Sequence, residues 1–269
     1  MVSLEDTTPT QRSIVSLPFV PIPSQFQVHG VTHCGRVRQS NEDALGYSDT
    51  FGLALVADGV GVGSGGGRAA RLAVRTLTRA LPAECAELGK PHPWTEHHSK
   101  QALLCALWRV QARIATDAGA LGLPKMATTL TTVWCVGSSV LIGHVGDSRA
   151  YRLRGGTFQQ LTRDHTILGD LQRDFSVITE EMKTKYAHVL NRAFSARREW
   201  VEPDITIEPW QAGDVFLACT DGLTGVVGDR EIAAVLGDVP LEKAPGVLVD
   251  LANAAGGRDN VAVVVARVG

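Results

Sequence analysis

The chain has 269 residues, of which 44% are hydrophobic and 20% charged. This composition supplies enough apolar material for a sizeable core and excludes global disorder. The formal net charge of −2 gives no strong field for nucleic acid or an anionic membrane. No apolar stretch approaches the roughly 20 residues that span a bilayer, and the N-terminus lacks the pattern of a signal peptide. Five cysteines without paired spacing indicate reduced thiols in a cytoplasmic protein.

The N-terminal half of the chain begins with a proline-containing lead-in and continues with a strand and two helices. Residues 1–25 predict an extended segment, and no later linker divides the chain, so residues 26–269 are expected to form a single domain. The apolar run Leu53–Ala57 predicts a buried strand. The glycine-rich segment Gly59–Gly67 then opens a helix.

Both helices are indicated by side chains at helical spacing. The first has an apolar stripe formed by Ala69, Ala73, Leu77 and Leu81. Its other face carries a basic row formed by Arg68, Arg71, Arg75 and Arg79. Such a basic row is most often a solvated face, although an acidic partner could bind it. The second helix is expected to end near Gly119, and its apolar positions are Leu103, Leu107, Val110 and Ile114.

The C-terminal half is predicted to be rich in hairpins. Strands are expected at Thr128–Val136, Val140–Val145, Ala150–Arg154, Thr157–Leu161, Ile205–Ile207, Val215–Cys219 and Val261–Ala266. The segment 166–200 is polar and helix-prone, with a helix start near Thr179, and two further helices are expected near Asp229–Leu236 and Leu241–Ala255, the second broken or started by Pro245. Hairpins between helices favour antiparallel sheets covered by helices over an alternating βαβ fold.

Four of these apolar runs meet an aspartate with a small neighbour. The pairs are Asp58-Gly59, Asp147-Ser148, Asp221-Gly222 and Asp259-Asn260. Each pair alone is typical of a turn. Together they suggest carboxylates that converge at strand ends, where like charges raise each other's pKa. No cationic side chain is obviously assigned to neutralise them. A hard divalent cation such as Mg²⁺ or Mn²⁺ would resolve this conflict, so the pattern favours a metal cluster.

Two other kinds of site are partly matched. The segment Gly61-Val62-Gly63-Ser64-Gly65-Gly66 satisfies the dinucleotide-binding pattern G-x-G-x-x-G. A nucleotide-binding oxidoreductase would need a parallel strand soon after the helix, but a second helix is predicted there. Cys34 resembles the start of a cysteine-phosphatase loop, yet Ser40 stands where that loop needs arginine. We therefore expect Cys34 to be an ordinary thiol and His165 to be a structural hydrogen-bonding residue.

The order of motifs resembles the metal-dependent protein phosphatase family, PPM or PP2C, and in particular its compact bacterial serine/threonine phosphatases. The resemblance covers about residues 28–267. The matching segments are Arg38–Asp43, Asp58-Gly59, Ala127–Thr129, Gly143–Tyr151, Leu161–Thr166, Asp221–Leu223 and Gly256–Asn260. Each motif is weak alone, but seven in the family's order are strong. The resemblance implies an α+β fold, a four-layer α-β-β-α sandwich of two antiparallel sheets flanked by helices.

The resemblance also implies the site and its chemistry. Two Mn²⁺ or Mg²⁺ ions are expected, with a third, weaker ion in bacterial members. The implied metal ligands are the bridging Asp58, the Gly59 carbonyl, Asp221 and Asp259, Asp43 directly or through water, and Asp147 with Asp221 at the third ion. Arg38 matches the arginine that clamps the substrate phosphate. The catalytic set is accordingly Arg38, Asp58, Asp221 and Asp259, and a metal-bridging water would hydrolyse phosphoserine and phosphothreonine in proteins without a phosphoenzyme.

The chain departs from the family pattern at several positions. Val60 replaces a residue that is a proton-donating histidine in some members, and the flap, residues 167–185, is idiosyncratic. None of these changes removes a matched metal ligand. The expected protein is a cytoplasmic monomer that reverses a serine/threonine kinase and binds neither nucleic acid nor membrane. The alternative is a catalytically weak or inactive module of the same fold with a binding or regulatory role.

Overall fold

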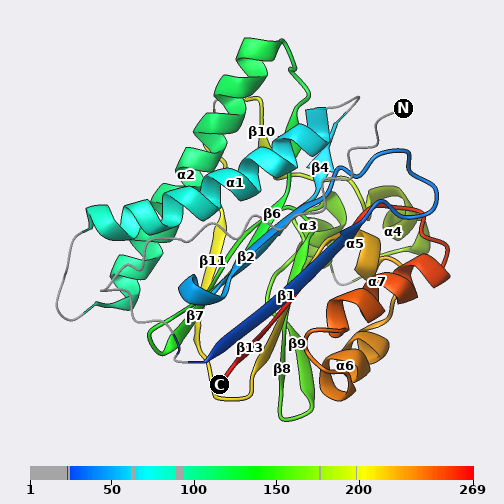
Figure 1. Cartoon of the computed structure of the whole chain (residues 1–269). Coiled ribbons are helices and arrows are strands. Elements are labelled where there is room, and N and C mark those ends of the chain that lie inside the picture. The colour runs from blue at the N-terminus through cyan, green and yellow to red at the C-terminus, as the bar shows by residue number, and fades with distance from the viewer. Residues whose placement is uncertain (1–22, 24, 62–64, 89–93, 176, 198) are drawn as a thin grey trace, which may run out of the picture.

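The computed structural model describes residues 23, 25–61, 65–88, 94–175, 177–197 and 199–269 (Figure 1). The predicted lead-in, residues 1–25, lies almost wholly outside the described residues. Of the glycine-rich segment, residues 62–64 also lie outside them.

The described strands form two five-stranded sheets and one small sheet, and every pairing is antiparallel. The first sheet has the order β1 (Phe26–His33), β13 (Val261–Val268), β12 (Val215–Cys219), β8 (Arg149–Arg154), β9 (Thr157–Gln160). The second sheet has the order β11 (Asp204–Pro209), β7 (Ser139–Val145), β6 (Leu130–Val136), β3 (Leu53–Ala57), β2 (Ala44–Ser48). The small third sheet has the order β10 (Phe194–Ser195), β5 (Ala127–Thr128), β4 (Gly59–Val60).

Helices cover the outer face of each large sheet (Figure 1). Helices α1 (Gly65–Glu87) and α2 (Glu96–Leu121) pack on the second sheet. The first sheet is covered by α5 (Asp221–Thr224), α6 (Asp229–Asp238) and α7 (Ala244–Ala254). The remaining helices are the 3-10 turn η1 (Asp49–Phe51), α3 (Ile167–Asp174) and α4 (Glu180–Tyr186). The predicted four-layer α-β-β-α sandwich is confirmed, with the small third sheet as an addition.

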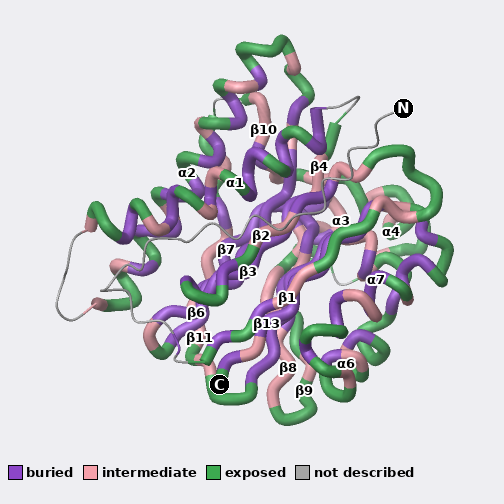
Figure 2. Tube along the Cα trace, in the orientation of Figure 1, coloured by how far each residue is buried: buried purple, intermediate pink, exposed green. Residues whose placement is uncertain are grey.

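The central strands are apolar on both faces because each is covered on both sides. In β3, Leu55 packs with α1 and α2, whereas Val56 packs between the two sheets. In β13, Val263 faces α6 and α7, whereas Val264 faces the second sheet. Side chains alternate along a strand, so a doubly covered strand reads as a continuous apolar run. Figure 2 shows these central strands as buried.

Most predicted elements are present, with changes at their ends. Helix α2 ends at Leu121 rather than near Gly119, because Gly122 adopts φ 66° and its N–H bonds back to the Ala118 carbonyl. Pro245 starts α7, lying in its first turn. The strand expected over Thr128–Val136 is divided at Thr129 into β5 and β6. Strands β1 and β2 were missed, since their mixed polar and apolar residues suit sheet edges.

Candidate active site

The five predicted aspartates lie at strand ends from both large sheets. Asp58 follows β3 and Asp147 follows β7 in the second sheet, and Asp43 directly precedes β2. In the first sheet, Asp221 follows β12 and Asp259 precedes β13. The negative charges of the other four all raise the pKa of Asp58. The structure therefore brings all five sequence-predicted carboxylates into one cluster.

The cluster is under electrostatic stress. Burial, followed by the charges of Asp43 and Asp221, raises the pKa of Asp58 well above its usual range. Burial likewise raises the pKa of Asp43 to about 7, although a hydrogen bond from Thr220 lowers it in part. Burial and the charge of Asp221 raise the pKa of Asp147 to about 7. Several oxygen donors that resist ionisation together fit a site for divalent cations such as Mg²⁺ or Mn²⁺.

Two basic side chains reach the rim of this cluster. The Nη2 atom of Arg38 donates to Oδ2 of Asp259 at 2.9 Å, and the Arg38 side chain is 57% exposed. The Nδ1 atom of His188 lies 3.5 Å from Oδ2 of Asp221, which raises the pKa of His188 through their hydrogen bond. The expectation that no cationic side chain is assigned to these carboxylates was therefore wrong for Asp259, which Arg38 contacts, and His188 is a second basic neighbour, beside Asp221.

The backbone of Asp58 is held by two threonines at the break between β5 and β6. The Thr129 N–H donates to the Asp58 carbonyl at 2.9 Å, and the Asp58 N–H donates to Thr129 Oγ1 at 2.9 Å. Thr128 Oγ1 donates to the same carbonyl at 2.8 Å. The Thr129 hydroxyl also bonds that of Ser148 at 2.7 Å, next to Asp147. These bonds tie the ends of β3 and β7 together.

The glycines after Asp58 permit a close backbone crossing. A Cβ on Gly59 would lie 2.3 Å from the carbonyl carbon of Gly66, and one on Gly66 would lie 2.6 Å from the Gly59 oxygen. The start of α1 thus packs directly on the segment that carries the predicted Gly59 ligand. Helix α1 leads into α2, and no pairing among the described strands is parallel. A dinucleotide-binding fold needs a parallel strand after the first helix, so this topology excludes that interpretation.

The loop that carries Arg38 and Asp43 is fastened to the Asp259-Asn260 pair. Asn260 Nδ2 donates to the carbonyls of Cys34 at 2.8 Å and Ser40 at 3.0 Å, and its Oδ1 accepts the Glu42 N–H at 2.8 Å. The thiol of Cys34 donates to the Arg38 carbonyl at 3.2 Å. These contacts give Cys34 and Asn260 structural roles in the loop.

Asp43 is anchored separately. Its Oδ2 accepts a 2.7 Å hydrogen bond from Thr220 Oγ1, and Thr220 directly precedes Asp221. The hydroxyl of Thr220 in turn accepts the Ala262 N–H at 2.9 Å. Thr220 thereby fixes Asp43 against the strands that carry Asp221 and Asp259. Sequence reasoning missed Thr220, although its place directly before an aspartate at a strand end was a usable signal.

His165 supports the Asp147 turn, as predicted for a structural histidine. The Nδ1 atom of its imidazole accepts the Gly146 N–H at 3.1 Å, and its backbone N–H donates to the Gly146 carbonyl at 2.7 Å. Its Nε2 lies 3.1 Å from Oδ2 of Asp204. Gly146 has φ 111°, and a Cβ there would lie 2.4 Å from Thr129 Cγ2. Only glycine fits this turn.

Comparison with known proteins identifies the class that this fold and site define, a protein phosphatase with a divalent-metal centre. The family model for protein phosphatase 2C matches residues 30–243. The serine/threonine phosphatase stp of Listeria welshimeri is 34% identical over 238 residues, which are 86% of this chain and 92% of that protein. The chain belongs to the protein phosphatase 2C family and is a metal-dependent protein phosphatase.

Solved structures agree with this assignment. The crystal structure of the Mycobacterium tuberculosis serine/threonine phosphatase PstP has a TM-score of 0.78 and 30% identity, covering 91% of this chain and 99% of that one. The PstP catalytic domain in complex with two manganese ions has a TM-score of 0.77 and 30% identity, covering 90% of this chain and 98% of that one. The predicted family, fold and enzyme class are confirmed.

Proposed function

We propose that this protein phosphatase hydrolyses phosphoserine and phosphothreonine esters of proteins, with the five clustered aspartates as its metal ligands. The observation that carries the proposal is the convergence of these carboxylates beside the exposed Arg38, since the charges of the other four all raise the pKa of Asp58. The two similar bacterial enzymes described above are serine/threonine phosphatases by name, and one of them was crystallised with two manganese ions.

In this proposal two Mn²⁺ or Mg²⁺ ions would be held by the Gly59 carbonyl and the clustered aspartates. Asp58 would be the ligand common to both ions, Asp221 and Asp259 would bind the first, and Asp43 would contribute directly or through water. When bound, such ions lower the pKa of water so that a nucleophile exists at neutral pH, and they neutralise phosphoryl charge. The backbone bonds of Asp58 to Thr128 and Thr129 hold its carboxylate in place, which limits reorganisation during the reaction.

Arg38 supplies the phosphate clamp. Its guanidinium is always charged and presents two N–H groups in a fork that fits phosphoryl oxygens. In the structure one nitrogen of this fork, Nη2, donates to Asp259, and in this proposal Arg38 exchanges that carboxylate for the phosphate when substrate and metal are bound. The exposed Val60 offers no proton for the leaving group. In this proposal a water molecule supplies the proton, and no phosphoenzyme is formed.

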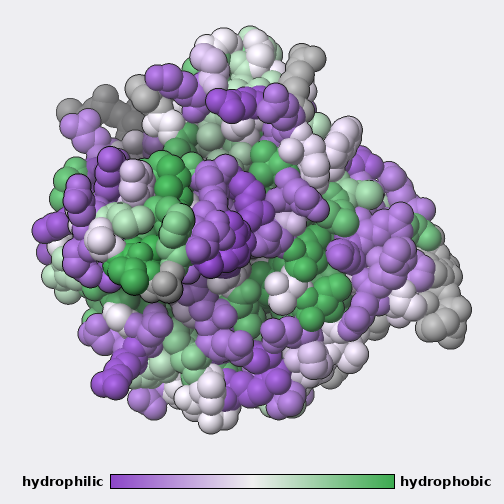
Figure 3. Space-filling model, turned by 180° about the vertical axis from the view of Figure 1, so that it is seen from behind, coloured by the Kyte–Doolittle hydropathy of each residue, from purple (hydrophilic) through white to green (hydrophobic). Residues whose placement is uncertain are grey.

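Further observations bear on the proposed domain, oligomeric state and cellular location. The terminal strands β1 and β13 pair along their length, from Phe26 with Val268 to His33 with Val261, which supports one domain over residues 26–269. None of the described helices is long and apolar enough to cross a membrane. Apolar and polar residues are interspersed on the face shown in Figure 3, and we propose that the enzyme is a monomer. We place the enzyme in the cytoplasm, where it reverses a serine/threonine kinase.

Turnover of a phosphothreonine peptide tests the proposal. The purified chain should release phosphate in Mn²⁺, lose this activity in EDTA and regain it when Mn²⁺ is returned. The variant Asp58→Asn is the matched negative control, because it keeps the size of the side chain and removes its charge. A non-catalytic binding module would retain the phosphopeptide without releasing phosphate, and that result would disprove hydrolysis.

A further inference from the structure

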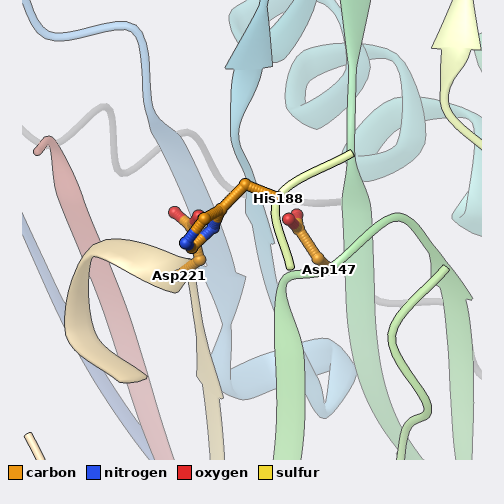
Figure 4. Close-up of side chains that lie close together, drawn as sticks. All are labelled: Asp147, His188 and Asp221. Atoms are coloured by element: carbon orange, nitrogen blue, oxygen red, sulfur yellow. The ribbon is translucent and has the colours of Figure 1, made fainter. Parts of the chain in front are cut away.

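The side chain of His188 lies beside two of the predicted metal ligands, although no sequence motif includes it. One ligand atom from each of Asp147, His188 and Asp221 lies within 4.8 Å of the others. Figure 4 shows the three side chains reaching one another from three separate segments. Asp147 is buried, Asp221 is partly exposed and His188 is exposed. The group therefore lies at the solvent side of the aspartate cluster.

The backbone around His188 fixes its position relative to Asp147. The Ile167 N–H donates to the Val189 carbonyl at 2.8 Å, and the Asn191 N–H donates to the His165 carbonyl at 3.0 Å. His165 itself exchanges two hydrogen bonds with Gly146, the residue before Asp147. A short chain of hydrogen bonds thus connects the two ligands. The approach of His188 to the carboxylates is consequently part of the fold.

The spacing of the three atoms fits one cation. Two ligands on opposite sides of an ion are about 4 Å apart, twice the usual metal–ligand distance. The three ligand atoms lie within 4.8 Å of one another, so an ion bound by all three would draw the exposed His188 side chain closer to the two carboxylates. Its imidazole nitrogen also changes the chemistry of the site, since nitrogen suits borderline transition metals whereas Mg²⁺ prefers oxygen.

We propose that His188, through Nδ1, is a ligand of an outer metal ion shared with Asp147 and Asp221, and that it makes this outer site prefer Mn²⁺ to Mg²⁺. The proposal rests on the proposed function for the identity of the inner ligands only. It also gives the segment after the flap a direct bond to the metal centre. A bound outer ion would hold residues 188–191 over the site.

Metal binding to the stripped protein tests this assignment without any measurement of activity. Calorimetry with Mn²⁺ should resolve tight binding at the inner site and a weaker outer event in the wild type. His188→Ala should weaken the outer event at least about ten-fold, as expected for the loss of a ligand contact, and leave the inner event unchanged. Asp147→Ala should remove the same outer event. His97→Ala, which removes an exposed histidine elsewhere, should match the wild type.

A spectroscopic arm identifies the nitrogen ligand directly. Pulsed electron paramagnetic resonance of the Mn²⁺-loaded protein should show ¹⁴N modulation from the His188 imidazole, which should diminish in His188→Ala. In titrations with Mg²⁺, the substitution His188→Ala should lower the affinity of the outer site less than it does with Mn²⁺. The variant His188→Asp should bind Mg²⁺ at this site more tightly than the wild type. Thermal melting in EDTA should differ little between the wild type and His188→Ala, because the His188 side chain is exposed.

Three results would overturn the proposal. They are an outer Mn²⁺ event of unchanged affinity in His188→Ala, ¹⁴N modulation of equal depth in both proteins, and an equal loss of Mg²⁺ and Mn²⁺ affinity. Failure of the proposed function is distinguishable from these. It would appear as absent phosphopeptide turnover in wild-type protein whose outer Mn²⁺ event still depends on His188.

Discussion

At the scale of single residues, the site is a group of carboxylates whose charges are only partly compensated by protein. Arg38 bonds Asp259 and His188 lies beside Asp221. Asp43 and Asp58, which lie deeper, keep raised pKa values. The same feature that makes the cluster suitable for cations therefore opposes folding of the metal-free protein at neutral pH.

The first prediction concerns the charge of Asp58 and uses Asp58→Asn in EDTA. The folded pKa of Asp58 lies above its ordinary value of 3.8, so the folded state binds the proton more tightly than the unfolded chain. The contribution of this group to stability therefore falls as pH rises from about 4 through the folded pKa. We expect Asp58→Asn to melt at a higher temperature than the wild type at pH 8 and at nearly the same temperature at pH 5.

Thermal melts of both proteins across this pH range measure the difference. The buried histidines also change the melting temperature with pH, but they do so equally in both proteins. Their contribution therefore cancels when the two proteins are compared. If Asp58→Asn is less stable than the wild type at pH 8 in EDTA, the charge of Asp58 does not oppose folding, and the electrostatic account is incorrect.

The second prediction concerns Arg38→Ala. Removing the phosphate clamp should raise KM for a phosphopeptide about ten-fold or more, as expected for loss of a charge-assisted, bidentate contact. Mn²⁺ affinity should stay equal or become tighter, because the guanidinium no longer occupies Asp259. Kinetics and calorimetry measure the two effects. Weaker Mn²⁺ binding in Arg38→Ala would contradict the assigned role. Cys34→Ser, in the same loop, is the control and should be nearly silent.

At the scale of secondary structure elements, the interruption between β5 and β6 positions the site. Thr129 leaves the strand ladder and bonds both the Asp58 backbone and the Ser148 hydroxyl. One buried side chain thereby connects the end of β3 with the turn before β8. Since Ser148 adjoins Asp147, the contact also links the segments that carry Asp58 and Asp147.

The third prediction compares Thr129→Val with Thr132→Val. Both changes keep the shape of a buried threonine and remove a hydroxyl that accepts a backbone N–H, from Asp58 in one case and Gly143 in the other. Each should cost about 1–3 kcal/mol of stability, because a donor loses its partner. Only Thr129→Val should also weaken Mn²⁺ binding and lower kcat. Equal effects of the two variants on Mn²⁺ affinity would show that the Thr129 bonds do not position the ligands.

At the scale of the whole molecule, the proposed metal ligands join the two sheets. Asp58 follows β3 of the second sheet, whereas Asp221 and Asp259 adjoin β12 and β13 of the first. The sheets otherwise meet through the apolar side chains between them, among them Val56, Phe216 and Val264. A cation bound by ligands from both sheets acts as a cross-link, and its binding energy adds to the stability of the folded chain.

The fourth prediction is that Mn²⁺ raises the melting temperature of the wild type. Stabilisation by a ligand of the folded state reaches about 2.7 kcal/mol at a concentration 100 times Kd. The increase should grow with the logarithm of Mn²⁺ concentration, be reversed by EDTA, and be much smaller in Asp58→Asn. Calorimetric melts over a Mn²⁺ series measure it. A shift of the same size in Asp58→Asn would mean that the cation binds elsewhere.

The amino-acid sequence by itself determined the elements whose signal is local. The doubly buried strands Leu53–Ala57 and Val215–Cys219 were predicted with their observed bounds, because continuous apolar runs ended by Asp-Gly are read within a few residues. The apolar stripe of α1 was visible for the same reason, and all of its predicted positions are buried. Four aspartates were found because each adjoins such a run: Asp58, Asp147, Asp221 and Asp259. Motif order then supplied the family, and with it Asp43.

Tertiary structure alone decided which groups meet. Arg38 and Asp259 are 221 residues apart in sequence, and no periodicity predicts their hydrogen bond. His188 lies in a polar stretch without a pattern, and it reaches Asp147 and Asp221 only because hydrogen bonds anchor its segment beside Gly146. The edge strands β1 and β2 were missed because their own residues carry no clear strand pattern. They are strands because they pair with β13 and β3, respectively. Local patterns report burial and turns, whereas partners depend on how distant segments pack.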